Sequence, residues 1–125
     1  MIIALPTADR VVAHAFYAKA FGFEAFGEPA DDGVPEPLQF RVEDGLVLML
    51  IPTGGFGWTV GRPVAERGTS EVAMTITLDG ADAVDAAFGR AVSAGAEVVA
   101  EPEQKPWAYT AAVADPDGHV WLLNS

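Results

Sequence analysis

The sequence contains no cysteine, which rules out disulfides, thiolate metal sites and a cysteine nucleophile. Basic residues are scarce: 7 lysines and arginines stand against 18 acidic residues, and the formal net charge is -11. Such a chain repels phosphate backbones and anionic lipid surfaces, so we expect no nucleic-acid and no membrane partner. No apolar run reaches the roughly 20 residues that span a bilayer, and residues 1–6 lack the basic flank of a signal peptide. We therefore expect a cytoplasmic protein.

Apolar residues are abundant: 50% of the 125 residues are hydrophobic and 20% are charged. This is enough for one domain with a real core. The acidity of the chain has two explanations. It favours a cationic small molecule as a partner, and it is also a common means of keeping a protein in solution.

Strand patterns and helix patterns alternate along the chain. Apolar residues four positions apart predict two helices, one through Val12, Phe16 and Ala20 and one through Val84, Phe88 and Val92. Capping side chains are available at Thr7 or Asp9 for the first helix and at Asp79 or Asp82 for the second. Strands are expected over residues 2–5, 23–27, 38–43, 46–51, 71–78, 97–100, 107–114 and 119–123.

The two halves of the chain match each other. An offset of 73 places the hairpin turn Asp44-Gly45 on Asp117-Gly118, and it holds from the first strand to the last. The match is loose in the helix and allows a slip of two residues in the first strand. It indicates a duplicated unit of one strand, one helix and three strands. We expect one α+β domain, 1–125, with module one at 1–52, a glycine-rich linker at 53–69 and module two at 70–125.

Two such βαβββ modules side by side predict a cupped mixed sheet with the helices outside. Side chains alternate along a strand. If Val72, Met74, Ile76 and Leu78 meet the helix of module two, Ala73, Thr75 and Thr77 point to the other side. That side is either a ligand cavity or a sheet surface in contact with solvent.

Two motifs resemble the vicinal oxygen chelate superfamily of glyoxalase I, bleomycin-resistance proteins and extradiol dioxygenases. Ala15-Phe16-Tyr17 with Phe21-Gly22-Phe23-Glu24 is similar to its first-helix signature, and residues 115–121 (Asp-Pro-Asp-Gly-His-Val-Trp) are similar to its final hairpin. The segments Arg62-Pro63 and 69–72 are similar to small bacterial glyoxalase-like members. The resemblance covers the whole chain and implies paired βαβββ modules, a cupped sheet and a homodimer.

The resemblance also implies where a metal would be held, on the first and last strand of each module. These positions fall on Met49 and Leu122, on Ile2 or Ala4, and on Ala73 or Thr75. None of these side chains is a normal ligand of a divalent metal. We therefore expect no metal, no cofactor and no catalytic residue. The prediction is a metal-independent protein that sequesters a planar or cationic small molecule.

Aromatic and polar residues are the candidates for contacting such a ligand. Trp58, Trp107 and Tyr109 either stack on a flat ligand at the mouth of the cup or seal the cup or a dimer interface. Gln39 and Arg41 lie on the strand face opposite Leu38 and Phe40, where Arg41 has a surface ion pair as an alternative role. The full candidate set is Gln39, Arg41, Met49, Trp58, Thr75, Thr77, Trp107, Tyr109 and Leu122.

Two other functions stay open. One is a metal-dependent glyoxalase-type lyase or isomerase, or a dioxygenase, with ligands elsewhere in the chain. The other is a remnant cleft that serves only assembly. The two histidines favour neither, since His14 is expected on a solvated helix surface and His119 in a structural hydrogen bond.

Overall fold

The computed structural model describes residues 1–125 and contains two sheets of four strands. The elements are β1 (Ile2–Thr7), α1 (Arg10–Phe21), β2 (Glu24–Phe26), β3 (Leu38–Glu43), β4 (Leu46–Pro52), α2 (Thr53–Val60), β5 (Ala73–Thr77), α3 (Ala81–Ser93), β6 (Glu97–Gln104), β7 (Tyr109–Ala114) and β8 (Val120–Asn124). The strand orders are β1-β4-β3-β2 and β5-β8-β7-β6. Strand β1 is parallel to β4, and β5 is parallel to β8, while all other strand pairs are antiparallel. This arrangement confirms the α+β class with mixed sheets.

The strand register resolves the slip that the sequence left open. Ala4 pairs with Met49 in the first sheet, and Thr75 pairs with Leu122 in the second. The last strands therefore keep the offset of 73, while the first strands are related by an offset of 71. The helices have the same offset as the first strands, because their N-caps, Asp9 and Gly80, are also 71 residues apart.

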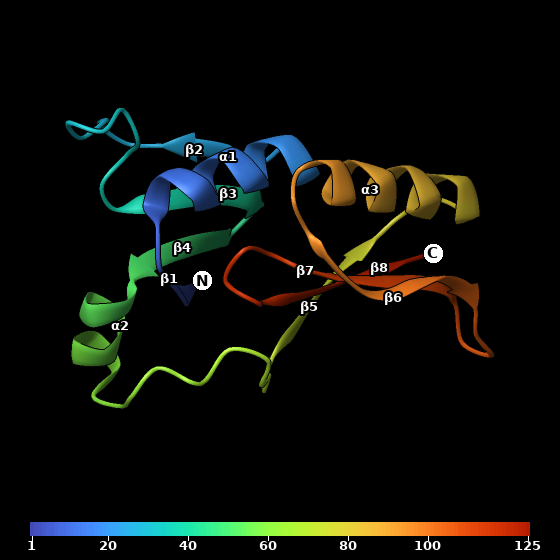
Figure 1. Ribbon diagram of the computed structural model, residues 1–125. Helices are drawn as coiled ribbons and strands as arrows, with labels where there is room; N and C mark the ends of the chain where they lie inside the picture. Colours follow the sequence, from blue (N-terminus) through green and yellow to red (C-terminus); the bar gives the residue numbers. More distant parts are fainter.

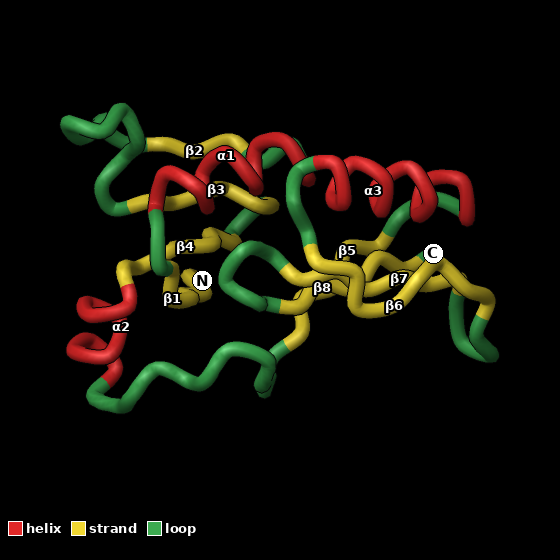
Figure 2. The backbone as a smooth tube through the Cα atoms, viewed as in Figure 1, coloured by secondary structure: helices red, strands yellow, loops and turns green.

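The two sheets lie side by side, and α1 and α3 form one row over the same face of both (Figure 1). The tube view shows α2 at one end of the molecule, beside β1 and β4, and the turn between β6 and β7 at the other end (Figure 2). The glycine-rich stretch expected as a linker is therefore partly helical, since α2 occupies its first eight residues. No helix has both the length and the apolar character needed to cross a bilayer.

The core lies between the helix row and the sheets. The buried side chains of α1 are Ala13, Phe16, Tyr17 and Ala20, and those of α3 are Val84, Ala87 and Ala91. Two residues of the predicted apolar stripes lie outside the core, since Val12 is 47% exposed and Val92 is 40% exposed. The reason is geometric: a step of four residues rotates about 40° past a full turn, so a stripe built only on that spacing leaves the buried face.

Strand alternation in β5 agrees with the prediction for Met74, Ile76 and Leu78, but Val72 lies before the strand and is 57% exposed. Met74 and Ile76 pack against the core, while Ala73, Thr75 and Thr77 are exposed on the other side. We call the sides of the two sheets that face away from the helices the open faces. They carry the positions at which the sequence placed a ligand.

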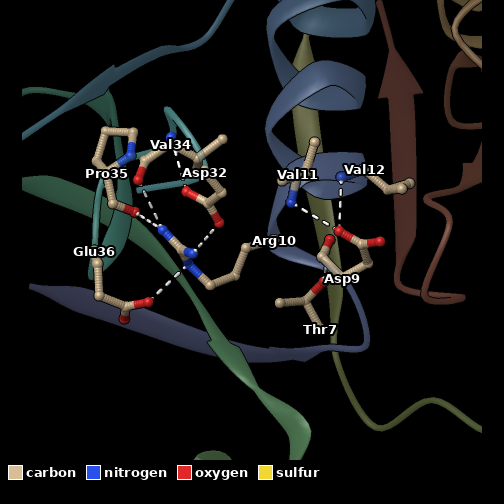
Figure 3. Close-up of polar contacts among 9 residues, drawn as sticks. All are labelled: Thr7, Asp9, Arg10, Val11, Val12, Asp32, Val34, Pro35 and Glu36. Atoms are coloured by element: carbon tan, nitrogen blue, oxygen red, sulfur yellow. Dashed lines mark hydrogen bonds and ion pairs between the residues drawn. The ribbon is translucent and has the colours of Figure 1, made fainter. Parts of the chain in front are cut away.

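The helix N-termini differ between the modules. Asp9 caps α1, because its carboxylate accepts hydrogen bonds from the backbone N–H groups of Val11 (2.9 Å) and Val12 (3.2 Å) (Figure 3). Gly80 stands at the equivalent position of α3 with a φ of 96° and offers no capping side chain. Of the four capping candidates in the sequence, only Asp9 therefore acts as a cap.

Candidate functional site

Four of the predicted ligand-binding residues form two rows on the open faces. In module one, Gln39 pairs with Met49, which pairs with Ala4. In module two, Thr75 pairs with Leu122. Cross-strand neighbours on one face lie within side-chain reach of each other. Each row is therefore a small surface of polar and apolar side chains, but the two rows belong to different sheets of the chain.

Thr77 and Arg41 extend these rows by one step along the strand. Thr77 pairs with Asn124, two residues beyond the Thr75–Leu122 pair. Arg41 is exposed and its guanidinium stands 4.8 Å from the ring centroid of Phe26, on the strand next to β3. This cation–π contact replaces the surface ion pair that the sequence offered as its alternative role.

The three aromatic candidates do not gather around one site within a chain. Trp58 is 87% exposed on α2, and Trp107 is 73% exposed in the turn between β6 and β7, at the opposite end of the molecule (Figure 1). Tyr109 lies on the helix side of β7, where it packs under α3 and donates a hydrogen bond of 2.7 Å to Asp85. That hydrogen bond raises the pKa of Tyr109.

Tyr109 is therefore removed from the candidate site. The physical reason is strand parity: Tyr109, Ala111 and Val113 share the side of β7 that meets the core, so Tyr109 cannot face the same way as Leu122. The sequence pattern suggested a strand from Trp107, but β7 begins only at Tyr109.

A resident divalent metal does not fit the residues at the open faces. The four positions that the resemblance assigns to metal ligands are filled, in the observed register, by Ala4, Met49, Thr75 and Leu122. A methyl group, a thioether, a hydroxyl and a hydrocarbon do not form the nitrogen and oxygen donor set that such ions need.

One cluster of possible ligands lies elsewhere, in the hairpin that precedes β8. Carboxylate or imidazole atoms of Asp115, Asp117 and His119 lie within 4.8 Å of one another. These atoms already have protein partners. Asp115 accepts hydrogen bonds from the backbone N–H groups of Asp117 (2.9 Å) and His119 (2.8 Å), and a further one from the Tyr17 hydroxyl. These hydrogen bonds give the cluster a structural role.

The same hairpin joins module two to module one, and we call residues 115–119 the latch. Asp117 accepts hydrogen bonds from the Thr7 hydroxyl (2.7 Å) and from the backbone N–H of Ala8 (2.8 Å). His119 donates through Nε2 to the backbone carbonyl of Pro6 at 2.7 Å, so the predicted structural hydrogen bond is confirmed. Each of these bonds joins residues more than 100 positions apart.

Tyr17 and Asp115 form the buried part of the latch. The Tyr17 hydroxyl donates to Asp115 and accepts a hydrogen bond from Nε1 of Trp121 at 3.1 Å. Burial, with the neighbouring Asp115 carboxylate, raises the pKa of Tyr17 well above its ordinary value. Burial also raises the pKa of Asp115, while its hydrogen bond from Tyr17 opposes that change. Sequence reasoning missed this pair, although both residues lie in the motifs that carry the family resemblance.

Arg10 anchors the loop between β2 and β3 to the start of α1. Its guanidinium forms ion pairs with Asp32 (2.7 Å) and Glu36 (2.9 Å) and donates hydrogen bonds to the backbone carbonyls of Val34 and Pro35 (Figure 3). The hydrogen bond from the Val34 N–H, together with Arg10, lowers the pKa of Asp32. Nothing in the sequence pattern singled out Arg10, because its partners lie more than 20 residues away.

His14 lies on α1, where the sequence placed it on a solvated surface. It is half-buried, and its ring stacks on Phe40 with 6.1 Å between ring centroids and 22° between ring planes. It therefore packs against the edge of the core and takes no part in a polar cluster.

A cleft of about 650 Å³ opens where the two modules face each other. Its walls come from β3 and β4 of module one and from β5 and α3 of module two, and 14 of its 18 lining residues are hydrophobic. Thr75 and Thr77 are the only predicted ligand-binding residues that line it. We call it the intermodule cleft.

Comparison with known proteins agrees with this architecture. The model of the Glyoxalase/Bleomycin resistance protein/Dioxygenase superfamily matches residues 3–123. The chain belongs to this superfamily. The resemblance seen in the helix and hairpin motifs is thus confirmed. A relative from Mycobacterium bovis, an uncharacterized protein, is 38% identical over 123 residues, which cover 93% of this chain and 76% of the relative.

Two solved structures illustrate the range of proteins that share the fold. A glyoxalase-related enzyme from Fulvimarina pelagi is 26% identical, with a TM-score of 0.85 over 98% of this chain and 84% of that one. TnmS3, an antibiotic binding protein from Streptomyces sp. CB03234, is 27% identical, with a TM-score of 0.67 over 98% of this chain and 91% of that one. The superfamily fold therefore serves both an enzyme and a binding protein among the neighbours of this chain.

Proposed function

We propose that this protein binds a small organic molecule without a metal ion and leaves it chemically unchanged. The observation that carries the proposal is the side-chain chemistry of the open faces. The strand register brings Ala4 opposite Met49 and Thr75 opposite Leu122, which are the positions where metalloenzymes of the superfamily would need ligands. Stabilising an enediolate or activating dioxygen requires a Lewis acid or redox metal, and these four side chains do not supply its ligands.

The proposed site consists of the two open faces brought together. Gln39 and Met49 supply one wall and Thr75, Thr77 and Leu122 the other. Because the two rows lie on separate sheets of one chain, a homodimer in which module one of one copy faces module two of the other completes the site. Trp58 and Trp107 lie at opposite ends of a chain. The proposed homodimer therefore allows Trp58 of one copy and Trp107 of the other to close the same site.

The net charge of -11 favours a cationic ligand, and the exposed indole rings favour a planar one. Arg41 then lies at the rim of the proposed site, where its contact with Phe26 keeps the guanidinium away from a bound cation. The 27% identity to an antibiotic binding protein supports the binding of a small organic molecule in general. We also propose that the protein acts in the cytoplasm, where a chain that needs no disulfide bonds can fold.

Tryptophan fluorescence tests the proposal directly. Protein treated with EDTA is titrated with daunorubicin, which is planar and cationic, and with other polycyclic antibiotics. We expect quenching by at least one compound, at the same Kd before and after EDTA, and recovery of that compound unmodified. Met49→Arg should weaken binding at least tenfold. Val11→Arg, at a helix position that is 45% exposed and outside the site, is the matched control.

Two results would overturn the proposal. One is the absence of quenching by every compound tested. The other is conversion of a compound only after Zn²⁺, Ni²⁺, Mn²⁺ or Fe²⁺ is added, which would favour a metal-dependent enzyme.

A further inference from the structure

The two modules meet at two junctions that the internal repeat makes equivalent. At the first junction, the latch of module two docks on β1 and α1 of module one. The latch forms hydrogen bonds with Tyr17, Thr7 and Pro6. At the second junction, the hairpin between β3 and β4 of module one faces β5 and α3 of module two. The repeat alone would predict a second latch there.

The second junction lacks most of the polar partners of the first. The observed offsets between the modules are 73 for the hairpins and 71 for the first strands and helices. Asp44 then keeps the carboxylate of Asp117, the acceptor in the latch. Val42, Leu46, Leu78 and Phe88 then stand where the first junction has Asp115, His119, Thr7 and Tyr17. Apolar side chains cannot form the hydrogen bonds that close the first junction. The intermodule cleft is the space that remains open at the second junction.

The cleft runs along the free edge of β5. All seven residues from 72 to 78 line it, although successive side chains of a strand point to opposite faces. A cavity contacts every residue of a strand only when it lies beside the edge. The sole strand partner of β5 is β8, so the backbone N–H and C=O groups on its other edge are available for hydrogen bonds in the cleft.

The other walls are aromatic and aliphatic. Phe21, Phe23 and Trp121 line the cleft together, and their ring centroids are 5.1 to 5.7 Å apart. The charged lining residues are Glu43 and Arg90, one of each sign, and neither takes part in an ion pair. The lining therefore carries no net charge, in contrast to the chain as a whole. The volume, about 650 Å³, lies within the usual range of small-molecule sites.

We propose that the intermodule cleft is a second ligand site, which takes an uncharged and largely aromatic small molecule. It shares Thr75 and Thr77 with the open-face site but differs from it in two respects: a single chain contains it, and its lining carries no net charge that would favour a cation. Ligand rings stack against the wall formed by Phe21, Phe23 and Trp121, while hydroxyl or carbonyl groups on the ligand bond to the edge of β5.

Binding of the uncharged dye Nile red tests this site with a matched pair of variants. Leu46→Arg places a charged side chain in the cleft, and Leu122→Arg makes the same change at a residue outside it that is equally half-buried. Circular dichroism checks that both variants fold. We expect Leu46→Arg to weaken dye binding at least tenfold and Leu122→Arg to change it less than twofold. Loss of dye binding only in Leu122→Arg would overturn the proposal.

A crystal of the unmodified protein grown with 1-bromonaphthalene provides a test that needs no variant. We expect anomalous bromine density between β5 and the Phe21–Phe23–Trp121 wall. Bromine density only on the open faces, or a cleft filled by side chains of a second copy, would overturn the proposal. The open-face site is tested separately by daunorubicin and Met49→Arg, so either site can fail without the other.

Discussion

A single hydroxyl group, that of Tyr17, connects the cores of the two modules. It donates to Asp115 and accepts from Trp121, so one oxygen satisfies two buried polar groups from module two. Leaving a buried donor or acceptor without a partner costs about 1–3 kcal/mol for each group. Asp115 and Trp121 are 1% and 3% exposed, so water does not replace the lost partner readily.

For Tyr17→Phe we expect a loss of about 2–4 kcal/mol in the free energy of unfolding at pH 7, since two buried groups lose their partner. A pH effect accompanies it. Folded Tyr17 keeps its proton at a pH where the unfolded residue, with a pKa near 10.0, loses it. Stability of the unmodified protein should therefore fall as pH rises above about 10, more steeply than in the variant.

Urea denaturation between pH 7 and pH 11 measures both effects. Tyr109→Phe is the control, because its hydroxyl bonds only to exposed Asp85 and its loss should cost less than the loss of Tyr17. Equal stability of Tyr17→Phe and the unmodified protein at pH 7 would contradict the role given to this hydroxyl.

At the scale of the elements, the two modules have the same topology but are stabilised by different polar contacts. Module one has a capped helix, and Arg10 in its first turn secures the adjacent loop. Module two begins its helix at Gly80 without a cap, and in its place supplies the latch. The repeated unit sets the order of strands and helices, and the substitutions within it decide which contacts close a junction and which leave a cleft.

The cap of α1 is testable by itself. Asp9→Ala should lower the free energy of unfolding by about 1 kcal/mol, because the N–H groups of Val11 and Val12 lose their acceptor. Asp82→Ala, in the first turn of α3, removes a charge near the helix N-terminus but no capping bond, so it should cost less. Chemical denaturation of both variants measures the difference, and equal costs would argue against the cap.

At the scale of the whole molecule, the open faces are the surfaces through which we propose that copies assemble. A chain leaves Thr75 and Ile2 exposed on these faces, and Met49 and Leu122 are half-buried there without a covering element. An apolar surface left in contact with solvent is a common site of association between chains. The proposed ligand site and the proposed dimer thus depend on the same surfaces.

Sedimentation equilibrium tests the assembly. We expect a mass of about twice the 13.1 kDa of one chain at micromolar concentration. Met49→Arg should shift the protein towards the mass of one chain, because it places a charge on the shared surface, while Val11→Arg should leave the mass unchanged. A single-chain mass for the unmodified protein would remove the shared site.

Local signals in the sequence determined the order of the eight strands and of helices α1 and α3, both hairpins and membership of the superfamily. Each of these depends on residues that are neighbours along the chain or on a repeat that keeps its spacing. The local signals left the cap of α1 open between Thr7 and Asp9 and did not predict α2. The sequence also selected the face of β5 that carries Thr75, because alternation along a strand needs no knowledge of the partner.

Only the tertiary structure decided which first-strand residues oppose Met49 and Leu122, that Tyr109 turns towards α3, and that one junction is latched while the other is open. These features depend on contacts between residues up to 113 positions apart, as in the hydrogen bond from His119 to Pro6. The same hairpin turn, Asp-Gly, occurs in both modules. The residues that surround each turn in space decide whether it forms a latch or borders a cleft.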